Sequence, residues 1–130
     1  MRNFLLILVM LFSLNIIAQD SCLYQYKAVI TEVYDGDTVT ARIDLGFNVS
    51  ITEKLRLDGI NTPEVRGSER PLGLISRDRL RDKILGREVI VKTLKDKKGK
   101  YGRYIAEIIY QGESVNHWLV SEGLAVYKEY

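Results

Sequence analysis

Asp35 and Gly36 stand between two runs of residues that are typical of β-strands. Residues 24–34 form a β-rich run, in which Val, Ile, Thr and Tyr are frequent, and the run is expected to be partly buried on both faces. Residues 38–45 have the same character. An Asp-Gly pair between two such runs is a strong signal for a tight turn that joins antiparallel strands. The folded part of the chain is therefore predicted to begin with a β-hairpin.

Two later segments have helical character. Residues 67–85 are predicted to form the principal helix, because Pro71 suits a first helical turn and Gly86 suits a C-terminal cap. Residues 114–122 are predicted to form a short helix that ends at Gly123.

Three further strands complete the predicted architecture. Residues 51–60, 87–94 and 103–110 carry strand patterns, so the principal helix falls between strands three and four and the short helix follows strand five. This order matches the five-stranded, partly open barrel of the oligonucleotide- and oligosaccharide-binding (OB) fold. The predicted fold class is mainly β with α (α+β).

The N-terminal residues resemble a secretory leader. Arg2 is followed by an apolar run over residues 4–12 and then by mostly small or apolar residues. Residues 1–18 are predicted to be a signal peptide, which leaves residues 19–130 as a single domain of a secreted or periplasmic protein. An uncleaved membrane anchor is the alternative, but the run is short for a span of about 20 residues.

Cys22 is the only cysteine, so no internal disulfide can form. A cysteine just after a leader can carry a lipid anchor. Gln19, Asp20 and Ser21 depart from the apolar and small residues that usually precede such an anchor. A free or intermolecular thiol is therefore the favoured reading over lipidation.

The charge of the chain is uneven along the sequence. The formal net charge of +2 says little about partners, but six basic residues crowd one stretch. A local cluster of this kind can steer a polyanion, although a solvated loop has the same composition. The six residues are Lys92, Lys95, Lys97, Lys98, Lys100 and Arg103.

Residues 56–64 hold a cation, several oxygen ligands and a lone carboxylate. Apolar and polar residues alternate up to residue 60, and the Thr62 and Pro63 pair imposes an extended or turn geometry at the end. Glu64 is therefore expected on a loop that leaves a sheet. This arrangement suits an anion-handling site on a rigid scaffold, and it also fits an ordinary surface strand and turn.

Three motifs follow one another in a fixed order: Asp-Gly-Asp-Thr at 35–38, the segment 56–64, and Lys-Tyr-Gly-Arg at 100–103. Together with Gly-Leu-Ala at 123–125, they resemble the staphylococcal nuclease (thermonuclease) family over about residues 26–127. The resemblance implies an OB-fold barrel that cuts DNA and RNA with little sequence preference. It also implies that the cut frees the 5′-oxygen and leaves 3′-phosphate ends.

The resemblance assigns roles to five residues. Glu64 matches the general base that takes a proton from the attacking water. Arg56 and Arg103 match the two arginines that bind phosphoryl oxygens, and a guanidinium fork suits two oxygens better than an ammonium group does. Lys100 and Tyr101 match positions that contact a terminal phosphate or stack on a nucleotide.

The resemblance also implies a site for one calcium ion. Its ligands would be the side chains of Asp37 and Asn61 and the backbone carbonyl of Thr62, all oxygen donors that suit a hard cation. Asp35 either supports this site or only builds the turn.

Two features depart from the family pattern. Asn61 stands where members commonly have Asp, and the missing charge is expected to cost metal affinity on the order of one to a few kcal/mol. Asp58 either compensates for that charge or pairs with Arg56. The family usually continues into a further C-terminal helix, so a chain that stops at Tyr130 is expected to leave part of the barrel uncovered. Three explanations stay open: the chain is a truncated copy, it covers that surface by self-association, or it tolerates the absence of the helix.

Two residues of the short helix are not assigned to the active site. His117 is not expected to be catalytic, and Trp118 is expected to anchor the core. Tyr127 and Tyr130 are weaker candidates for the cleft wall. Three readings of function remain open. The first is a secreted calcium-dependent nuclease, the second is a nucleic-acid-binding module weakened in catalysis by Asn61, and the third is a cell-surface interaction domain held by Cys22.

Overall fold

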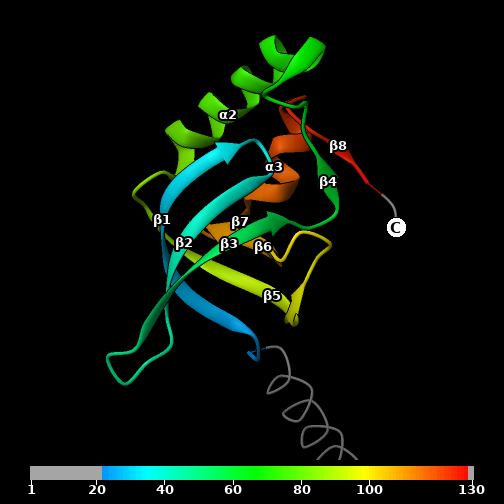
Figure 1. Ribbon diagram of the computed structural model, residues 1–130. Helices are drawn as coiled ribbons and strands as arrows, with labels where there is room; N and C mark the ends of the chain where they lie inside the picture. Colours follow the sequence, from blue (N-terminus) through cyan, green and yellow to red (C-terminus); the bar gives the residue numbers. More distant parts are fainter. Residues whose placement is uncertain (1–21, 129–130) are drawn as a thin grey trace, which may run out of the picture.

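The computed structural model describes residues 22–128, and its strands close into a barrel (Figure 1). Neighbouring strands follow the order β3-β2-β1-β5-β6-β7, and β3 also pairs with β6 in parallel, which closes the sheet on itself. The predicted five-stranded OB-fold barrel, mainly β with α, is confirmed. The barrel strands are β1 (Gln25–Asp35), β2 (Thr38–Asp44), β3 (Ser50–Leu57), β5 (Glu88–Lys98) and β6 (Tyr104–Tyr110), and the short β7 (Glu113–Ser114) extends the sheet.

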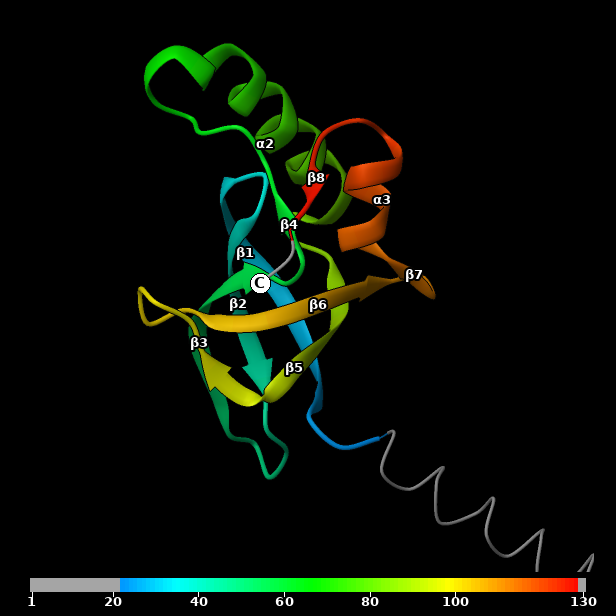
Figure 2. The same cartoon turned by 90° about the vertical axis from the view of Figure 1, so that its right-hand side faces the viewer.

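Two α-helices cover one end of the barrel, opposite the β2–β3 hairpin (Figure 2). The principal helix α2 (Arg70–Ile84) follows a 3₁₀ turn (Gly67–Glu69), and it buries a stripe of residues spaced three or four apart against the barrel. The short helix α3 (Val115–Ser121) begins after Ser114, whose hydroxyl accepts a hydrogen bond from the backbone N–H of His117. Both helices lie where the sequence predicts them. The stripe of α2 is Gly73, Ser76, Leu80 and Ile84.

One apolar core joins the barrel to both helices. Leu55 and Leu57 from β3 are fully buried with Leu80 from α2 and Leu119 from α3. Trp118 is half-buried and packs against this core, in agreement with its expected role. Within residues 22–128, no helix has the length and apolarity needed to cross a membrane.

The third strand ends earlier than predicted. It stops at Leu57 rather than at residue 60, because Gly59 adopts a positive φ of 73° that breaks the extended chain. A separate short strand β4 (Ile60–Asn61) follows, and it pairs with β8 (Val126–Tyr127) near the end of the described residues. The candidate metal-ligating stretch is thus part of a small second sheet.

The fourth strand is longer than predicted, and it includes most of the basic stretch that the sequence suggests is a loop. β5 continues to Lys98, with an irregularity where Lys95 and Asp96 have positive φ values of 50° and 53°. Asp96 holds this bulge by accepting hydrogen bonds from the hydroxyls of Thr93 (2.6 Å) and Tyr26 (2.9 Å). The lysines therefore project from a strand of fixed shape.

A β-bulge in β1 directs residues into the site. The register between β1 and β2 shifts after Ile30 and again after Val33. As a result, the next buried side chains after Ile30 are those of Val33 and Asp35. The burial of alternate residues along this strand is therefore interrupted once, between Ile30 and Val33. As a result, Asp35 is buried at the end of the barrel covered by α2. The signal peptide predicted at residues 1–18 lies outside the described residues, as does Tyr130.

Candidate functional site

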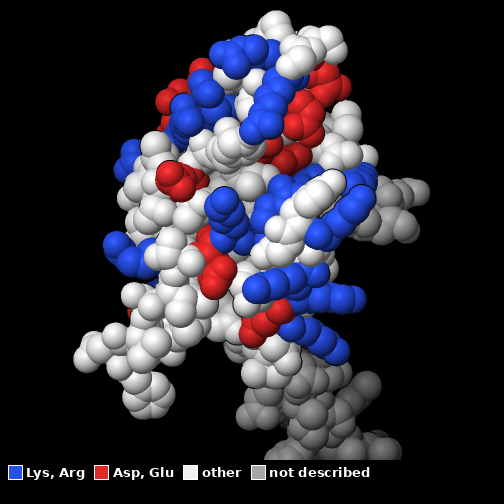
Figure 3. All heavy atoms as spheres, viewed as in Figure 1, with Lys and Arg blue, Asp and Glu red and all other residues white. Residues whose placement is uncertain are grey.

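A cleft of about 1300 Å³ opens at the end of the barrel where the β1–β2 turn, β3 and α2 meet. Seven basic and four acidic side chains are among its lining residues. Figure 3 shows basic side chains on this face both over α2 and over the β5–β6 hairpin. The whole chain has a formal net charge of only +2, but basic side chains clearly outnumber acidic ones among the residues that line this cleft.

The cleft gathers most of the residues predicted to form a site. The lining includes six of the eight predicted residues, which come from three separate parts of the chain. The other two lie close by: Thr62 is buried beside Asp37, and the Lys100 ammonium lies 5.6 Å from the centre of the Tyr101 ring. The six are Asp37, Arg56, Asn61, Glu64, Tyr101 and Arg103.

The β1–β2 turn is packed directly on Thr62. A Cβ atom on Gly36 would lie 2.6 Å from Thr62 Cγ2, so no larger residue fits there without displacement. Asp35 Oδ1 accepts a hydrogen bond from the backbone N–H of Asp37 (3.0 Å), and Asp37 Oδ2 accepts one from the N–H of Thr62 (3.0 Å). Asp35 therefore builds the turn. Burial, with the charges of Asp37 and Glu64 as further causes, raises the pKa of Asp35 to about 6.

Arg56 is held by four oxygen atoms. Its Nη1 donates to Leu57 O (2.6 Å), and its Nη2 donates to Ile60 O (2.8 Å) and Asn61 Oδ1 (2.6 Å). The same Nη2 lies 3.3 Å from Asp37 Oδ2. The ion pair of Arg56 is therefore with Asp37 and not with Asp58. The guanidinium is fixed against the oxygens that the sequence suggests as metal ligands.

Arg103 reaches the cleft from the loop before β6. Its Nη1 donates to Thr38 Oγ1 (2.8 Å), and its guanidinium carbon lies 5.4 Å from the centre of the Tyr101 ring. Its Nε is buried and has no hydrogen-bond partner within residues 22–128. A buried donor without an acceptor is costly, so this N–H is ready to bind an oxygen of a ligand.

Glu64 combines a fixed backbone with a free side chain. Its N–H donates to Glu69 Oε2 (2.9 Å), and a Cβ atom on Gly73 of α2 would lie only 2.2 Å from its carbonyl oxygen. The Glu64 carboxylate is exposed and has no hydrogen bond or ion pair in the described part of the chain. It can therefore accept a proton or bind a cation without first breaking a contact.

The residues around Asp37 suit a hard cation in kind but supply little charge. No group of three or more His, Cys, Asp or Glu side chains within residues 22–128 is placed to hold a metal ion. The carboxylate of Asp37, the amide of Asn61 and the carbonyl of Thr62 are all oxygen donors of the type that calcium prefers. A cation there would compete with the Arg56 guanidinium for two of these oxygens.

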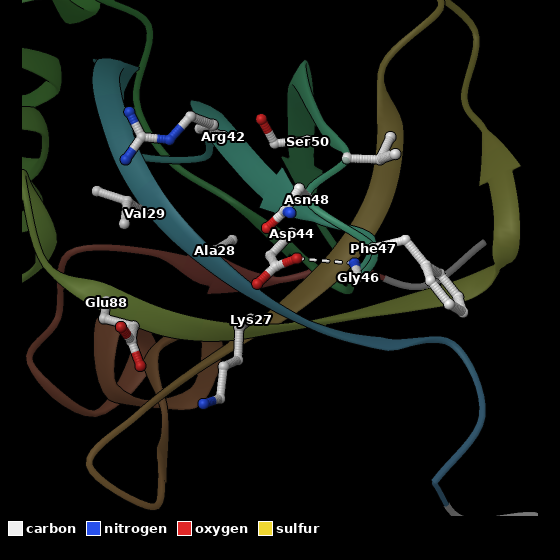
Figure 4. Close-up of a pocket in the computed structure, with 11 residues that line it drawn as sticks. Lys27, Ala28, Val29, Arg42, Asp44, Gly46, Phe47, Asn48, Ser50 and Glu88 are labelled. Carbon is white, nitrogen blue, oxygen red and sulfur yellow. Dashed lines mark hydrogen bonds between the residues drawn. The ribbon is translucent and has the colours of Figure 1, made fainter.

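The opposite end of the barrel has a second hollow, of about 490 Å³, which lacks such convergence (Figure 4). Its Asp44 carboxylate accepts a hydrogen bond from Gly46 N (2.7 Å) and so serves the turn. Phe47 points away from the pocket and is fully exposed. His117 also lies apart from the large cleft, where it contacts Tyr127 OH (3.2 Å) and approaches Glu107 (3.7 Å).

Several cleft residues were not predicted from the sequence. Tyr34 sits in a strand-like run without a recognisable motif, and the arginines of α2 look like part of a mixed-charge solvated face. Only their position on the side of α2 that faces β1 makes them cleft residues. The additional basic and aromatic residues are Tyr34, Lys54, Arg66, Arg77, Arg81 and Lys128.

The fold and the site define a class: OB-fold proteins whose cleft suits a polyanion. The model of the staphylococcal nuclease homologue family matches residues 54–130, more than half of the chain, and the chain belongs to this family. The match confirms the resemblance drawn from the motifs. No curated protein matches the chain. Membership indicates a nuclease or nucleic-acid-binding domain, with nucleic acid as its substrate or ligand.

Proposed function

We propose that the protein is a secreted, calcium-dependent nuclease that hydrolyses phosphodiester bonds of DNA and RNA with low sequence specificity. One observation carries the proposal: Arg56 and Glu64, from one segment of the chain, and Arg103, from a distant one, line the same cleft. Phosphodiester hydrolysis needs a base for the attacking water and positive charge for the phosphoryl oxygens, and these three side chains supply both.

The two arginines are held in different ways. Arg56 is oriented by its bonds to the carbonyls of Leu57 and Ile60, so its position is set before substrate arrives. Arg103 has one bond to Thr38 and a free Nε. Donors that are fixed before binding stabilise charge in the transition state with little reorganisation. Glu64, whose carboxylate is free, takes the proton from water as the water attacks phosphorus.

Asp37, Asn61 and the Thr62 carbonyl would hold one calcium ion. When bound, the ion supplies positive charge next to the phosphoryl oxygens. Two of the ligand oxygens already contact Arg56 Nη2, Asp37 Oδ2 at 3.3 Å and Asn61 Oδ1 at 2.6 Å, so the ion would share them with the guanidinium. Because Asn61 is uncharged, the site is expected to need more calcium than one with a second carboxylate.

The test is the variant Glu64→Gln, which keeps the shape of the side chain and removes the base. We expect it to fold normally and to lose turnover of single-stranded DNA by about 100-fold or more, the usual range for a lost general base. The control is Glu88→Gln, an exposed glutamate at the opposite end of the barrel. Normal turnover in Glu64→Gln, or a loss explained by unfolding, would refute the assignment.

A second function has a specific observation in its favour. The short contact of Arg56 with Asn61 Oδ1 (2.6 Å) favours a nucleic-acid-binding module in which the metal site no longer operates. The variant Asn61→Asp separates the two functions. A large gain in turnover at low calcium identifies a weakened enzyme, whereas folded protein that binds a strand and cuts it in neither form identifies a binding module.

Secretion follows from the leader predicted at residues 1–18. The protein recovered from the medium or the periplasm of producing cells is expected to begin at Gln19. N-terminal sequencing of that material tests this, and recovery of chains that begin at Met1 in the membrane fraction would contradict it.

A further inference from the structure

Resting on the nuclease function proposed above, we infer that Tyr34 and Arg66 form a second nucleotide-binding subsite for single-stranded nucleic acid. It lies across the reaction centre from the side where Tyr101 stands. The motifs do not include either residue, and neither is among the residues that the family resemblance assigns.

Tyr34 is an aromatic platform held in place by an arginine. Half of its surface is exposed at the end of β1, and its hydroxyl accepts a hydrogen bond from Arg66 Nη2 (2.8 Å). The backbone beside it is also fixed, because the carbonyl of Val33 accepts two hydrogen bonds from Arg81 of α2 (3.2 and 3.0 Å). An exposed ring next to a guanidinium is the combination that stacks a base and neutralises its phosphate.

The opposite wall of the cleft repeats this combination. The Tyr101 ring is exposed, and the charged groups of Lys100 (5.6 Å) and Arg103 (5.4 Å) lie near its centre. The cleft thus has two exposed tyrosines, Tyr34 and Tyr101, each accompanied by an arginine.

The order of the strands places the reacting groups between these two platforms. Around the closed barrel, β6 is followed by β3, β2 and β1. Tyr101 belongs to the loop before β6, Arg56 to β3, and Tyr34 to β1, while Asp37 stands just before β2. A strand that runs from Tyr101 to Tyr34 therefore crosses Arg56 and Asp37.

The surroundings of Tyr34 suit both parts of a nucleotide, the base and the phosphate. Leu85 and Val65 line the cleft with it and offer apolar surface to a base. Arg77 adds positive charge from α2, although Asp78 partly neutralises it at 3.0 Å, and Glu32 is the one carboxylate of β1 near this wall besides Asp35. Arg66 has no ion pair within residues 22–128, so its charge is available to a phosphate.

Two platforms have a consequence for the mode of cleavage. A strand held on both sides of the scissile phosphate binds more tightly than one held on a single side, since each stacked base adds its own free energy. Internal phosphodiester bonds are therefore expected to be cut in preference to terminal ones.

The experiment compares two substrates with the purified full-length chain and calcium. One is a single-stranded oligothymidylate of about twelve nucleotides, within the range that one OB fold contacts. The other is thymidylyl-thymidine, whose one phosphate is the scissile one, so it has no further phosphate for Arg66 to bind. Tyr34→Ala and Arg66→Ala are each expected to lower kcat/KM for the oligonucleotide about tenfold, and Arg66→Ala is expected to leave the dinucleotide unchanged. Tyr34→Phe keeps the ring and is expected to stay near the unaltered value.

Matched controls are Tyr24→Ala and Arg87→Ala, which remove an exposed tyrosine and an exposed arginine outside the cleft. If the unaltered protein cuts both substrates and Tyr34→Ala cuts the oligonucleotide equally well, the subsite is refuted and the nuclease stands. If the unaltered protein cuts neither substrate, the nuclease is refuted. The subsite is then decided by the affinity of the same variants for the oligonucleotide, and an unchanged affinity refutes it.

Discussion

Arg56 and Arg103 carry the same charge but are held in different ways. Arg56 donates to two backbone carbonyls and to the Asn61 side chain, so its fork has a fixed direction. Arg103 has one bond to Thr38, and its buried Nε lacks an acceptor. The guanidinium of Arg56 is therefore oriented by the barrel, whereas Arg103 has an Nε donor that is not used by the protein and can bind a ligand.

This difference makes Arg103→Lys an informative variant. A lysine keeps the charge but loses the planar fork and the Nε donor. We expect turnover of single-stranded DNA to fall by about 100-fold, as for other losses of a transition-state donor, with little change in the free energy of unfolding. Steady-state kinetics and urea unfolding measure the two quantities. Arg87→Lys, outside the cleft, is the control, and full turnover in Arg103→Lys would show that charge alone is sufficient.

At the scale of elements, α2 fixes the position of the proposed base through a close backbone approach. Gly73 faces the carbonyl of Glu64, where an added Cβ atom would lie 2.2 Å from oxygen and 2.9 Å from the carbonyl oxygen of Pro63. The Pro71 that opens the helix and the buried Leu80 that anchors it set the approach. The helix thus acts on the site through its packing and not through a catalytic side chain.

Gly73→Ala tests this packing. Because the contact is with backbone atoms that cannot turn aside, either α2 or the Glu64 loop must shift. We expect a loss of about 1–3 kcal/mol in the free energy of unfolding together with lower turnover. Urea unfolding and kinetics measure both effects. Leu72→Ala, an exposed position in the same helical turn, is the control, and a Gly73→Ala protein with unaltered stability and turnover would contradict the account.

For the whole molecule, the distribution of charge matters more than its sum. The formal net charge is only +2, yet the cleft has seven basic side chains against four acidic ones. A field concentrated in one hollow attracts a polyanion to that hollow, and the lysines of β5 form a further basic region outside it (Figure 3).

Salt dependence measures this charge. Lys54 of β3 lines the cleft, and its replacement in Lys54→Ala is expected to make the slope of log affinity for single-stranded DNA against log salt less negative by about 0.7. Fluorescence anisotropy with Glu64→Gln in the background prevents cleavage during titration. Lys27→Ala, at the opposite end of the barrel, is the control. Equal slopes in all three proteins would place the strand outside this cleft.

The sequence predicts local features well because their causes are local. The turn at Asp35 and Gly36, the helix that begins near Pro71 and the motif that holds Arg56 and Glu64 all depend on near neighbours. These features were enough for the barrel and for most of the candidate site.

Features that depend on distant residues could not be predicted in this way. The pairing of β4 with β8 joins Asn61 to Val126, and no pattern in either segment specifies the other. The bulge of β5 depends on Tyr26 and Asp96, which are far apart in the chain. The role of Arg66 likewise depends on Tyr34, from another strand.

The pairing of β4 with β8 has a consequence for how the chain folds during its synthesis. Synthesis makes all five barrel strands by Tyr110, well before Val126 and Tyr127, which complete the backbone partners of Ile60 and Asn61. Until Val126 and Tyr127 emerge, the stretch that leads to Glu64 lacks its neighbouring strand. For a protein proposed to cut RNA, the cleft is then completed only after every strand of the barrel has been made.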